Sequence, residues 1–421
     1  MNAQAGSAWV LLSCVVPRAD GVGIEKRAWS HLAAMAALRP PRLVLALTPA
    51  QLAQAPDLAF LNGLCSVVHV LPLDASARGR RLDNTAAFLA QRLLLWGRPR
   101  WQPRAGAVAA LLQALGGARL GDVFCFRLAC FELWRLLAGQ HGLSAQRLVV
   151  DFDDIESLAQ QRALAQDGSL WGRAHRLAAR LEIAEQRRLE TRALRSHEVL
   201  VCSAVDEARL RERAPAARVA VVPNAYPVLP ALPPREPGDT LNLLFLGTLS
   251  YAPNIDAADH LVHTLLPAIH RAWPGPVRLQ IVGRRPVPRV QALHRPPEVQ
   301  VLPDVADITS AYAQADVVVV PIRFGGGTRI KILEALSLGR PVVTTTLGVE
   351  GLDLQHERDL LVADAPDAFA QACARIAGDA ALAARLASQG RRSFLALYGD
   401  DIVRGRTQAL LSRPLSSSTA P

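Results

Sequence analysis

Short and almost uninterrupted runs of apolar residues alternate with longer helical stretches along the whole chain. Apolar runs without polar alternation predict strands covered on both faces, which is typical of parallel sheets joined by crossover helices. The number of runs exceeds what one compact sheet accommodates, so the pattern predicts an α/β fold of two doubly wound domains. The runs are Trp9–Val16, Leu43–Leu47, Val67–Leu71, Val123–Phe126, Leu148–Val150, Val199–Cys202, Val219–Val222, Leu241–Gly247, Val277–Gly283, Val299–Leu302, Val317–Val320, Pro341–Thr345 and Leu360–Ala363.

A proline-rich segment separates the first seven runs from the last six. Residues 227–239 contain five prolines and predict a stiff linker. We therefore expect a Rossmann-like domain over residues 1–226, a second domain over 240–411 that ends in alanine- and leucine-rich helix, and a disordered tail over 412–421. In such folds a ligand binds at the carboxyl ends of the strands, where the domains face each other.

Composition excludes several classes of protein. The chain has 421 residues, of which 50% are hydrophobic and 20% charged, so it is neither disordered nor fibrous. No apolar run approaches the roughly 20 residues of a membrane-spanning helix, and no basic residue precedes the first run as a signal peptide requires. The six cysteines form no Cys-x-x-Cys pair and are expected to be core residues in a reducing compartment. These features predict a cytoplasmic protein.

The net charge of +10 comes almost entirely from arginine, because only Lys26 and Lys331 are lysines. One arginine-rich segment is interleaved with Leu93–Trp96 and Trp101, which is typical of a segment lying on an anionic membrane and suits an enzyme at the inner membrane face. A solvated basic face explains the same composition. Nucleic-acid binding is not supported, since no helix-turn-helix, zinc-finger or RNA-recognition pattern is present. The arginines are Arg78, Arg80, Arg81, Arg92, Arg98, Arg100 and Arg104.

The segment 317–343 carries the most informative pattern, which is a buried strand, a glycine loop, a helix and the next strand. The loop contains Gly325, Gly326 and Gly327, with Thr328 as the expected N-cap of the helix. Arg329 and Lys331 then occupy the first turn without any carboxylate, although a helix N-terminus disfavours cations by roughly 0.3–1 kcal/mol. Free amides, helix dipole and two cations together predict a site for an anion such as a diphosphate. The alternative is that both cations extend into solvent.

Glu334 follows about one turn later on the same helix. Its carboxylate is near enough to the predicted phosphate site to accept hydrogen bonds from the 2′- and 3′-hydroxyls of a ribose. The alternative, an ordinary surface glutamate, is disfavoured by the apolar neighbours Leu333, Ala335 and Leu336. The helix is expected to end at Gly339.

These residues resemble the nucleotide-binding domain of the retaining glycosyltransferases of family 4. The resemblance is continuous from about Leu241 to Tyr398 and weaker in the first half. It implies the GT-B fold of two facing Rossmann-like domains, and transfer of a sugar from a nucleotide-diphosphate donor to a hydroxyl of a glycan or lipid-linked acceptor. It implies no cofactor and no metal. The segments that carry it are the glycine loop and its helix, Phe245–Asp256, Leu279–Gly283, Val301–Val305 and Gly348–Leu352.

The resemblance assigns roles residue by residue. Glu334 matches the second of two glutamates in the family motif and is implied to hold the ribose. Gly326 stands where the first glutamate would touch the donor sugar, a departure typical of the branch with a Gly-Gly-Gly-Thr-Arg-x-Lys loop. Arg329 and Lys331 replace the usual clamps of the diphosphate, because Thr248 and Leu249 stand at the positions of the basic pair. The loop residue Gly247 and the strand-end residues Gly283, Asp304 and Val305 are implied to line the nucleotide site.

The first half offers two further candidates. Gly21, Gly23 and Lys26 follow the first strand in a phosphate-loop pattern, although most Gly-x-Gly pairs are only turns. Asp153 and Asp154 lie in a cluster with Asp151 and Glu156 at another strand end, and crowding would raise at least one pKa if they share a site. Asp153 stands where many family members have a histidine. Orientation of a substrate or base catalysis is one interpretation, and an arginine-paired cluster is the other.

Other functions stay open at this point. The departures at Gly326 and Asp153 allow a sugar-nucleotide-binding protein that has lost catalysis, and the same fold serves nucleotide-sugar epimerases. A dehydrogenase is disfavoured, because the G-x-G-x-x-G fingerprint follows neither first strand.

Overall fold

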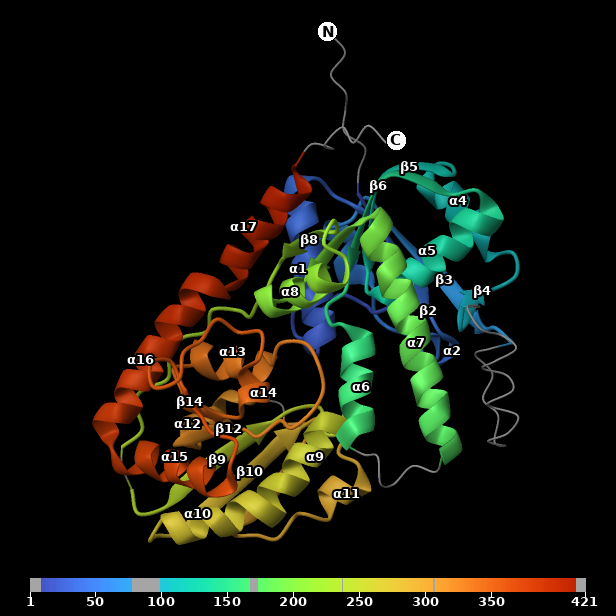
Figure 1. The fold of residues 1–421 in the computed structure, drawn as a ribbon. Helices are drawn as coiled ribbons and strands as arrows, with labels where there is room; N and C mark the ends of the chain where they lie inside the picture. Colours follow the sequence, from blue (N-terminus) through green and yellow to red (C-terminus); the bar gives the residue numbers. More distant parts are fainter. Residues whose placement is uncertain (1–8, 78–98, 167–172, 237, 306, 414–421) are drawn as a thin grey trace. The chain divides into compact units, whose positions relative to one another are not determined.

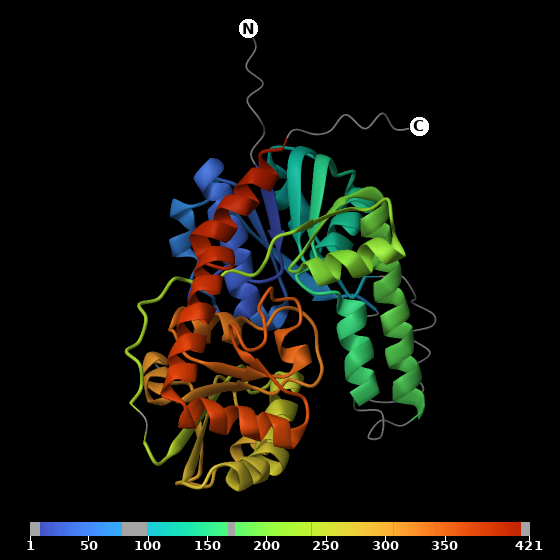
Figure 2. The ribbon, with the colours of Figure 1, turned by 60° about the vertical axis from the view of Figure 1, so that its left-hand side comes forward.

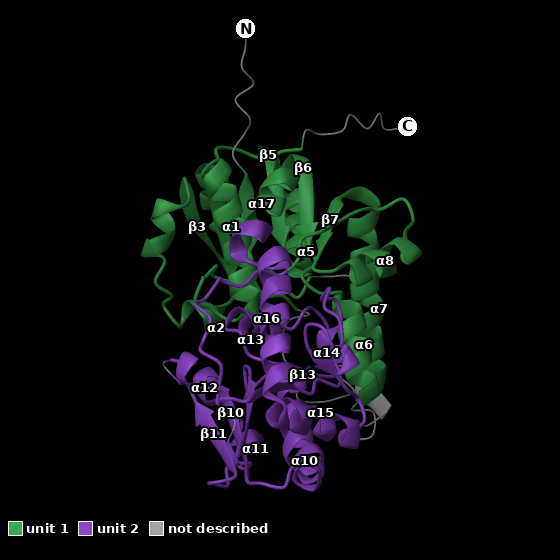
Figure 3. Ribbon diagram, turned by 90° about the vertical axis from the view of Figure 1, so that its left-hand side faces the viewer, with its two compact units in different colours: residues 1–223, 404–421 green, residues 224–403 purple. Residues whose placement is uncertain are grey.

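The computed structural model describes residues 9–77, 99–166, 173–236, 238–305 and 307–413. The chain divides into two compact units, residues 1–223 with 404–421 and residues 224–403 (Figure 3). Each unit has its own sheet and its own hydrophobic core. The prediction of an α/β fold with two doubly wound sheets is confirmed.

The first unit is built on an eight-stranded sheet in the order β4-β3-β2-β1-β5-β6-β7-β8 (Figure 1). All neighbouring strands are parallel except β4, which runs antiparallel to β3. The strands are β1 (Val10–Ser13), β2 (Arg42–Leu47), β3 (Val67–Ala75), β4 (Trp101–Pro103), β5 (Arg119–Phe126), β6 (Ser144–Asp151), β7 (Glu198–Val201) and β8 (Arg218–Val221).

Helices connect these strands, and the connection from β6 to β7 contains two of them, α6 and α7, which stand next to each other (Figures 1 and 2). The helices are α1 (Gly23–Leu38), α2 (Pro49–Leu52), α4 (Ala107–Leu115), α5 (Leu128–His141), α6 (Glu156–Gln166), α7 (Arg173–Ser196) and α8 (Ala204–Arg213), with a 3₁₀ turn at Ala59–Gly63.

The second unit is built on a six-stranded, wholly parallel sheet in the order β11-β10-β9-β12-β13-β14. Its strands are β9 (Leu241–Leu246), β10 (Val277–Gly283), β11 (Val299–Pro303), β12 (Val317–Val320), β13 (Val342–Thr344) and β14 (Leu361–Val362). Its helices are α9 (Ala252–His260), α10 (Leu266–Ala272), α11 (Pro288–Gln291), α12 (Thr309–Gln314), α13 (Ile330–Ser337), α14 (Thr346–Val349), α15 (Pro366–Gly378) and α16 (Ala380–Leu397), with a π-helical turn at Leu261–Leu265. No helix within the described parts of the chain is long and apolar enough to cross a membrane.

Every apolar run of the sequence overlaps one strand of the structure. The strand that the pattern misses is β4, an edge strand of three residues with Trp101 and Pro103 half-buried and Gln102 exposed. Such a short strand at a sheet edge buries too little apolar surface to leave a signal in the sequence.

Each sheet contains a point at which the direction of strand addition reverses. In the first unit this point lies between β1 and β5, and in the second unit it lies between β9 and β12. The loops after the two central strands diverge at such a point and leave a crevice at the carboxyl ends of the strands. The topology therefore marks the loops after β1, β5, β9 and β12 as candidates for ligand binding.

The proline-rich segment 227–239 packs along the second unit. The amide of Leu229 donates to Ser337 Oγ at 2.9 Å, and the amide of Leu232 donates to the carbonyl of Leu338 at 3.0 Å. The Arg340 guanidinium donates to the carbonyl of Pro233 at 2.9 Å. The segment therefore belongs to the second unit over its described residues, because hydrogen bonds to α13 and its C-terminal end fix it there.

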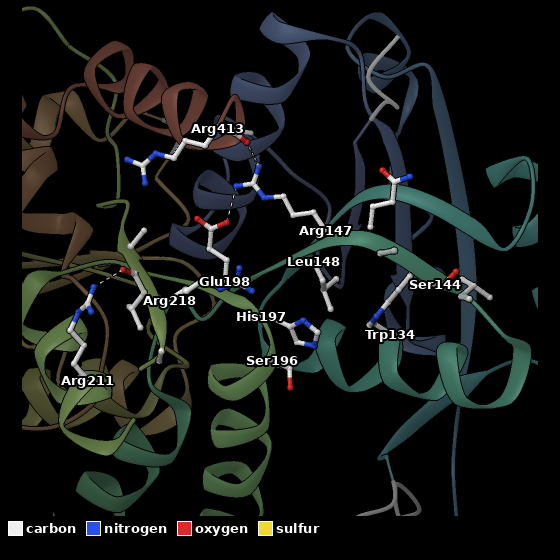
Figure 4. Close-up of a pocket in the computed structure, with 16 residues that line it drawn as sticks. Trp134, Ser144, Arg147, Leu148, Ser196, His197, Glu198, Arg211, Arg218 and Arg413 are labelled. Carbon is white, nitrogen blue, oxygen red and sulfur yellow. Dashed lines mark hydrogen bonds and ion pairs between the residues drawn. The ribbon is translucent and has the colours of Figure 1, made fainter. Parts of the chain in front are cut away.

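An arginine of the first unit binds the end of the last helix, α17 (Asp400–Leu411). Arg147 donates to the carbonyl oxygens of Leu410, Leu411 and Arg413 at 3.1–3.2 Å. The same guanidinium donates to the Glu198 carboxylate at 2.7 Å (Figure 4). A cation on the last carbonyls of a helix satisfies groups that have no partner within the helix.

This contact explains where the unit boundary differs from the one expected from sequence. Residues from 404 onward belong to the first unit, whereas the sequence placed residues 240–411 in one C-terminal domain. The first boundary falls at 223/224 rather than 226/227. An arginine far away in the sequence leaves no pattern in the helix that it binds. Residues 414–421 of the expected tail lie outside the described residues.

Candidate active site

Two glycines at neighbouring strand ends of the second unit pack against each other. Gly283 ends β10, and a Cβ at this position would overlap the carbonyl oxygen of Gly247, which follows β9. A Cβ on Gly247 would lie 2.6 Å from Asn254 Nδ2 and 3.0 Å from Lys331 Nζ. Position 283 therefore requires glycine, whereas a side chain at position 247 would displace the Asn254 amide. The loop after β9 lies directly against the Lys331 side chain.

The glycine loop after β12 has the conformation that its sequence requires. Gly325 has φ +109° and Gly327 has φ +65°, values that other residues rarely adopt. A Cβ on Gly325 would also lie 3.1 Å from Pro253 Cγ in the segment after β9. Gly326 lies between these two glycines, and the loop runs into α13.

Helix α13 begins one residue later than the sequence indicates. Arg329 is the N-cap and no side chain caps the helix, so the expectation of Thr328 as the N-cap is wrong. The Thr328 hydroxyl instead accepts a hydrogen bond from Asn224 Nδ2 at 2.7 Å. The first turn contains no acidic residue, as expected, and Gly339 closes the helix with φ +69°.

Arg329 lies against the loop that precedes it. Its Nη1 donates to the carbonyl oxygens of both Gly326 and Gly327. The guanidinium therefore holds the glycine loop and leaves a positive charge at the start of α13. An anion at this point would meet the charge, the loop amides and the helix dipole together.

Lys331 is half-buried between α13 and the segment after β9. Its ammonium donates to Asn254 Oδ1 at 2.8 Å and lies 4.3 Å from the centre of the Phe245 ring. Burial, together with the Arg329 charge, lowers the pKa of Lys331 to about 7, although Glu334 opposes the shift. Within the described residues no carboxylate is hydrogen-bonded to this ammonium, so a lysine of lowered pKa lies beside Gly247 and would gain from a bound anion.

Glu334 is 8% exposed, which excludes an ordinary surface glutamate. One of its carboxylate oxygens accepts a hydrogen bond from the hydroxyl of Tyr226, and the other accepts one from the hydroxyl of Tyr312 at 3.0 Å. The side chain is therefore held from two directions, with a small exposed edge.

The end of β11 joins the same surface. The amide of Asp304, a residue with φ +48°, donates to the carbonyl oxygen of Gly283 at 3.0 Å. Val305 is half-buried and packs against the core of the second unit. The structure thus places the predicted nucleotide-site residues of the second half at one edge of one sheet.

The first glycine loop is built differently. The carboxylate of Glu25 accepts a hydrogen bond from the amide of Val22 at 2.9 Å, which places a negative charge on the N-terminal end of α1. Neither Gly21 nor Gly23 is among the residues of positive φ. Lys26 is half-buried in the first turn of α1, where its amide bonds the carbonyl of Val22 at 2.9 Å. A phosphate at this loop would meet a carboxylate.

A buried ion pair occupies the carboxyl edge of the first sheet. Arg27 on α1 donates to both carboxylate oxygens of Asp151 at 2.6 and 2.7 Å, and His31 Nε2 lies 3.0 Å from the same carboxylate. All three side chains are at most 2% exposed. Burial alone would raise the pKa of Asp151, but Arg27 and His31 hold it well below its usual range. Asp151 is therefore a structural anchor that joins β6 to α1.

Asp153 and Asp154 follow this anchor. Asp153 has φ +55° and lies 3.7 Å from Arg27 and 3.9 Å from Arg127, so the arginine-paired arrangement that the sequence left open is present. Asp154 is half-buried beside it. Burial raises the pKa of Glu156, with the Glu190 and Asp153 charges adding to the shift, although Arg127 lies 3.0 Å away and opposes it.

Several residues around these sites were not found by sequence reasoning. Tyr226, Tyr312 and Asn254 contact Glu334 or Lys331, and Arg27 holds Asp151. Tyr226 lies at the edge of the proline-rich segment and Tyr312 lies within a short helix, so neither carries a motif. Arg27 stands next to Lys26 and gave no signal in the sequence, because arginine is frequent throughout the chain.

The predicted membrane-facing arginines lie mostly outside the described residues, which exclude 78–98. Of the two that are described, Arg100 pairs with Glu182, and Arg104 lies 3.4 Å from Asp74. Trp101 is half-buried in β4.

Comparison with known proteins relates the residues of this site to a protein family. Residues 240–379 match the family model of the glycosyl transferases group 1. The chain carries a group 1 glycosyltransferase domain. Since the match covers β9 to α15, it includes the glycine loop, Lys331 and Glu334 of this glycosyltransferase.

Solved structures similar to this glycosyltransferase span almost its whole length. Sucrose-phosphate synthase from Thermosynechococcus elongatus is 18% identical with a TM-score of 0.67, over 96% of this chain and 98% of the other. Anabaena HepE in complex with UDP and glucose is 16% identical with a TM-score of 0.60, over 97% and 100%. WaaG, a glycosyltransferase involved in lipopolysaccharide biosynthesis, is 13% identical with a TM-score of 0.59, over 96% and 100%.

At such identities the likeness establishes the fold, which is GT-B with two Rossmann-like units. None of the curated proteins matches the chain in sequence. The family match over residues 240–379 is what identifies a sugar transferase, and the solved structures add the fold.

Proposed function

We propose that this glycosyltransferase belongs to family 4 and moves a sugar, with retention of anomeric configuration, from a nucleotide-diphosphate donor to a hydroxyl of a glycan or lipid-linked acceptor. The observation that carries the proposal is the convergence at the β9/β12 switch point. A lysine of lowered pKa, an arginine-held glycine loop and a buried glutamate meet there on one helix end.

The donor diphosphate would bind at the start of α13. Lys331 and Arg329 would neutralise its charge, and the amides of Gly325 to Thr328 would donate to its oxygens. Glu334 would accept hydrogen bonds from the ribose hydroxyls. Gly247, Gly283, Asp304 and Val305 would line the remaining nucleotide surface.

In the proposed reaction the bond between the anomeric carbon and the diphosphate breaks, and its electron pair goes to the β-phosphate oxygen. The acceptor hydroxyl bonds to the same face of the sugar, and its proton passes to the departing phosphate. Because Gly326 carries no carboxylate, we propose this front-face route in place of a covalent enzyme intermediate. The catalytic contribution of Arg329 and Lys331 is stabilisation of the charge that develops on the diphosphate.

Asp153 and Asp154 are proposed to orient substrate from the first unit. Asp153 would do so as a hydrogen-bond acceptor while it interacts with Arg27 and Arg127. Gly21, Gly23 and Lys26 are proposed as secondary contacts only, because Glu25 already lies on that helix end.

The acceptor and the setting belong to the same proposal. Polysaccharide or glycoconjugate synthesis at the cytoplasmic face of a membrane fits the arginine-rich segment 78–104, and WaaG is a neighbour with a role in lipopolysaccharide biosynthesis. No metal or other cofactor is proposed. The two alternatives are an impaired nucleotide-sugar-binding protein and a nucleotide-sugar epimerase.

Turnover of labelled UDP-, GDP- and ADP-sugars with and without candidate acceptors separates these functions. The proposal predicts transfer of label to the acceptor, release of nucleoside diphosphate and an unchanged anomeric configuration by NMR. Binding without turnover would favour the impaired protein, and reaction without an acceptor would favour the epimerase. Isolation of a covalent glycosyl–protein intermediate would rule out the front-face route.

A further inference from the structure

Two tyrosines from separate parts of the chain hold the carboxylate of Glu334. Tyr226 precedes β9 and Tyr312 lies on α12, yet their hydroxyls reach different oxygens of the same carboxylate. The two tyrosines are 4% and 0% exposed. Of the four tyrosines in the chain, two therefore have their hydroxyl groups on one buried acid.

Both tyrosines act as hydrogen-bond donors. Burial, together with the Glu334 charge, raises the pKa of Tyr226 and of Tyr312 above the ordinary value for a phenol. The hydroxyls stay protonated at any physiological pH, and a carboxylate only accepts hydrogen bonds. Each oxygen of Glu334 thus uses one lone pair for a tyrosine and keeps another for a further donor.

The tyrosines are themselves fixed in place. The amide of Tyr226 donates to the carbonyl oxygen of Tyr398 at 3.0 Å, and Tyr226 also forms a parallel bridge with Gly399. The carbonyl oxygen of Tyr312 accepts from Arg340 Nε at 2.7 Å. Backbone contacts therefore anchor both donors, so the plane of the Glu334 carboxylate is set before any ligand arrives.

A carboxylate with a fixed plane and one accepting lone pair left on each oxygen is complementary to two neighbouring hydroxyl donors. The ribose of a ribonucleotide presents such a pair, and a 2′-deoxyribose lacks one of the two. Discrimination between the two sugars depends on the geometry of the acceptor. A freely rotating carboxylate would adapt to the single hydroxyl of a 2′-deoxyribose, so less affinity would be lost.

We infer that Tyr226 and Tyr312 are positioning residues that make the enzyme select ribonucleotide over 2′-deoxyribonucleotide donors through Glu334. The inference rests on the proposed nucleotide site and deepens it, because it states the chemical class of nucleotide accepted there. A purely structural role predicts another result. Two tyrosines that only satisfy the hydrogen bonds of a buried acid would support folding, and their removal would leave the preference for ribose over 2′-deoxyribose unchanged.

The test is isothermal titration of the full chain with three pairs of nucleotides, UDP and 2′-deoxy-UDP, ADP and 2′-deoxy-ADP, and GDP and 2′-deoxy-GDP. The variants are Tyr226→Phe, Tyr312→Phe and Glu334→Gln. Tyr398→Phe is the matched control, because Tyr398 is a buried tyrosine of the same unit whose hydroxyl accepts from the amide of Asp353 at 2.6 Å. Melting curves confirm that each variant is folded.

In the wild type we expect the affinity for the best-bound ribonucleotide to exceed the affinity for its deoxy partner by about tenfold. This ratio corresponds to the loss of one hydrogen bond to a charged group. Tyr226→Phe and Tyr312→Phe should each lower this ratio to about threefold or less, mainly by weakening the binding of the ribonucleotide. Tyr398→Phe should keep the wild-type ratio. Two variants at independent positions keep the test decisive if one of them fails to fold.

Three results would overturn the inference. If both tyrosine variants weaken the binding of the ribonucleotide and of its deoxy partner by the same factor, the tyrosines are structural and the preference for ribose has another origin. If the wild type binds ribonucleotides and their deoxy partners alike, the inference fails while the proposed function stands. If the wild type binds no nucleotide of the three pairs, the proposed nucleotide site fails and the inference falls with it.

Discussion

The two glycine loops of this enzyme have the same sequence pattern and different physical properties. Each follows a buried central strand and runs into a helix that carries a lysine near its start. In the first unit the Glu25 carboxylate bonds the amide of Val22 at the N-terminal end of α1. In the second unit the start of α13 carries Arg329 and Lys331 and no acid.

The backbone differs in the same direction. Gly325 and Gly327 adopt positive φ, which only glycine tolerates well, whereas Gly21 and Gly23 do not. The comparison shows that a strand–glycine–helix pattern is not enough to identify a phosphate site. The charge within the first helical turn decides whether the amides there are available to an anion.

The largest expected effect comes from removing each lysine in turn. Lys331→Met should weaken the affinity for the preferred nucleoside diphosphate by about 30-fold, or about 2 kcal/mol, because a charged hydrogen bond to phosphate is lost. Lys26→Met should change it by less than about threefold, since Glu25 offsets the charge of that helix end. Isothermal titration measures the affinity of both variants. Equal losses of affinity would contradict the assignment of phosphate binding to the second loop alone.

The next effect concerns the backbone of the second loop. Gly325→Ala should destabilise the protein by about 1–3 kcal/mol, because the residue would need a strained φ and its Cβ would press against Pro253. Gly238→Ala is the control, since a Cβ there meets no atom within 4 Å. Chemical denaturation of both variants measures the difference. A Gly325→Ala protein as stable as the control would show that the loop is not constrained.

The lowered pKa of Lys331 predicts a pH dependence of nucleotide binding. Near pH 7 and above, the free enzyme holds this lysine increasingly as the neutral amine, and a bound diphosphate favours the ammonium. Binding then takes up a proton, so affinity should fall as the pH rises from 7 to 9, by at most about tenfold per pH unit. Lys331→Met should remove this slope, which titration across the pH range would show. An affinity that rises with pH would contradict the assignment.

The smallest effect tests the first loop itself. Glu25→Gln keeps a side-chain acceptor for the Val22 amide but removes the negative charge at the end of α1. We expect a loss of about 0.3–1 kcal/mol in the free energy of unfolding and little change in nucleotide affinity. If the variant instead bound nucleotide severalfold more tightly, the first loop would be a phosphate site that Glu25 restrains.

The sequence predicts the fold well because buried parallel strands leave continuous apolar runs. Each of those runs overlaps a strand, and among the described strands only the half-exposed edge strand β4 escapes the pattern. The unit boundary was predicted less well, since it depends on Arg147 binding the end of α17 across more than 260 residues of chain.

The candidate site is predictable where chemistry is local. Glu334, Lys331 and the glycine loop lie within one short segment, so their spacing reveals their relation. Tyr226 reaches Glu334 across 108 residues, and Asn254 reaches Lys331 across 77, so only the fold brings these residues together. The N-cap was assigned to Thr328 because its hydroxyl suits that role, and the competing contact with Asn224 was invisible in the sequence.

The central claim is that the β9/β12 edge of the second unit binds a nucleotide-diphosphate sugar through Lys331 and Glu334. A thermal-shift panel of UDP-, GDP- and ADP-sugars tests it most directly, with the wild type, Glu334→Ala and Lys331→Met side by side. At least one nucleotide sugar should raise the melting temperature of the wild type, and both variants should lose most of that rise. A wild type whose melting temperature no nucleotide sugar raises, or variants that respond as fully as the wild type, would contradict the claim.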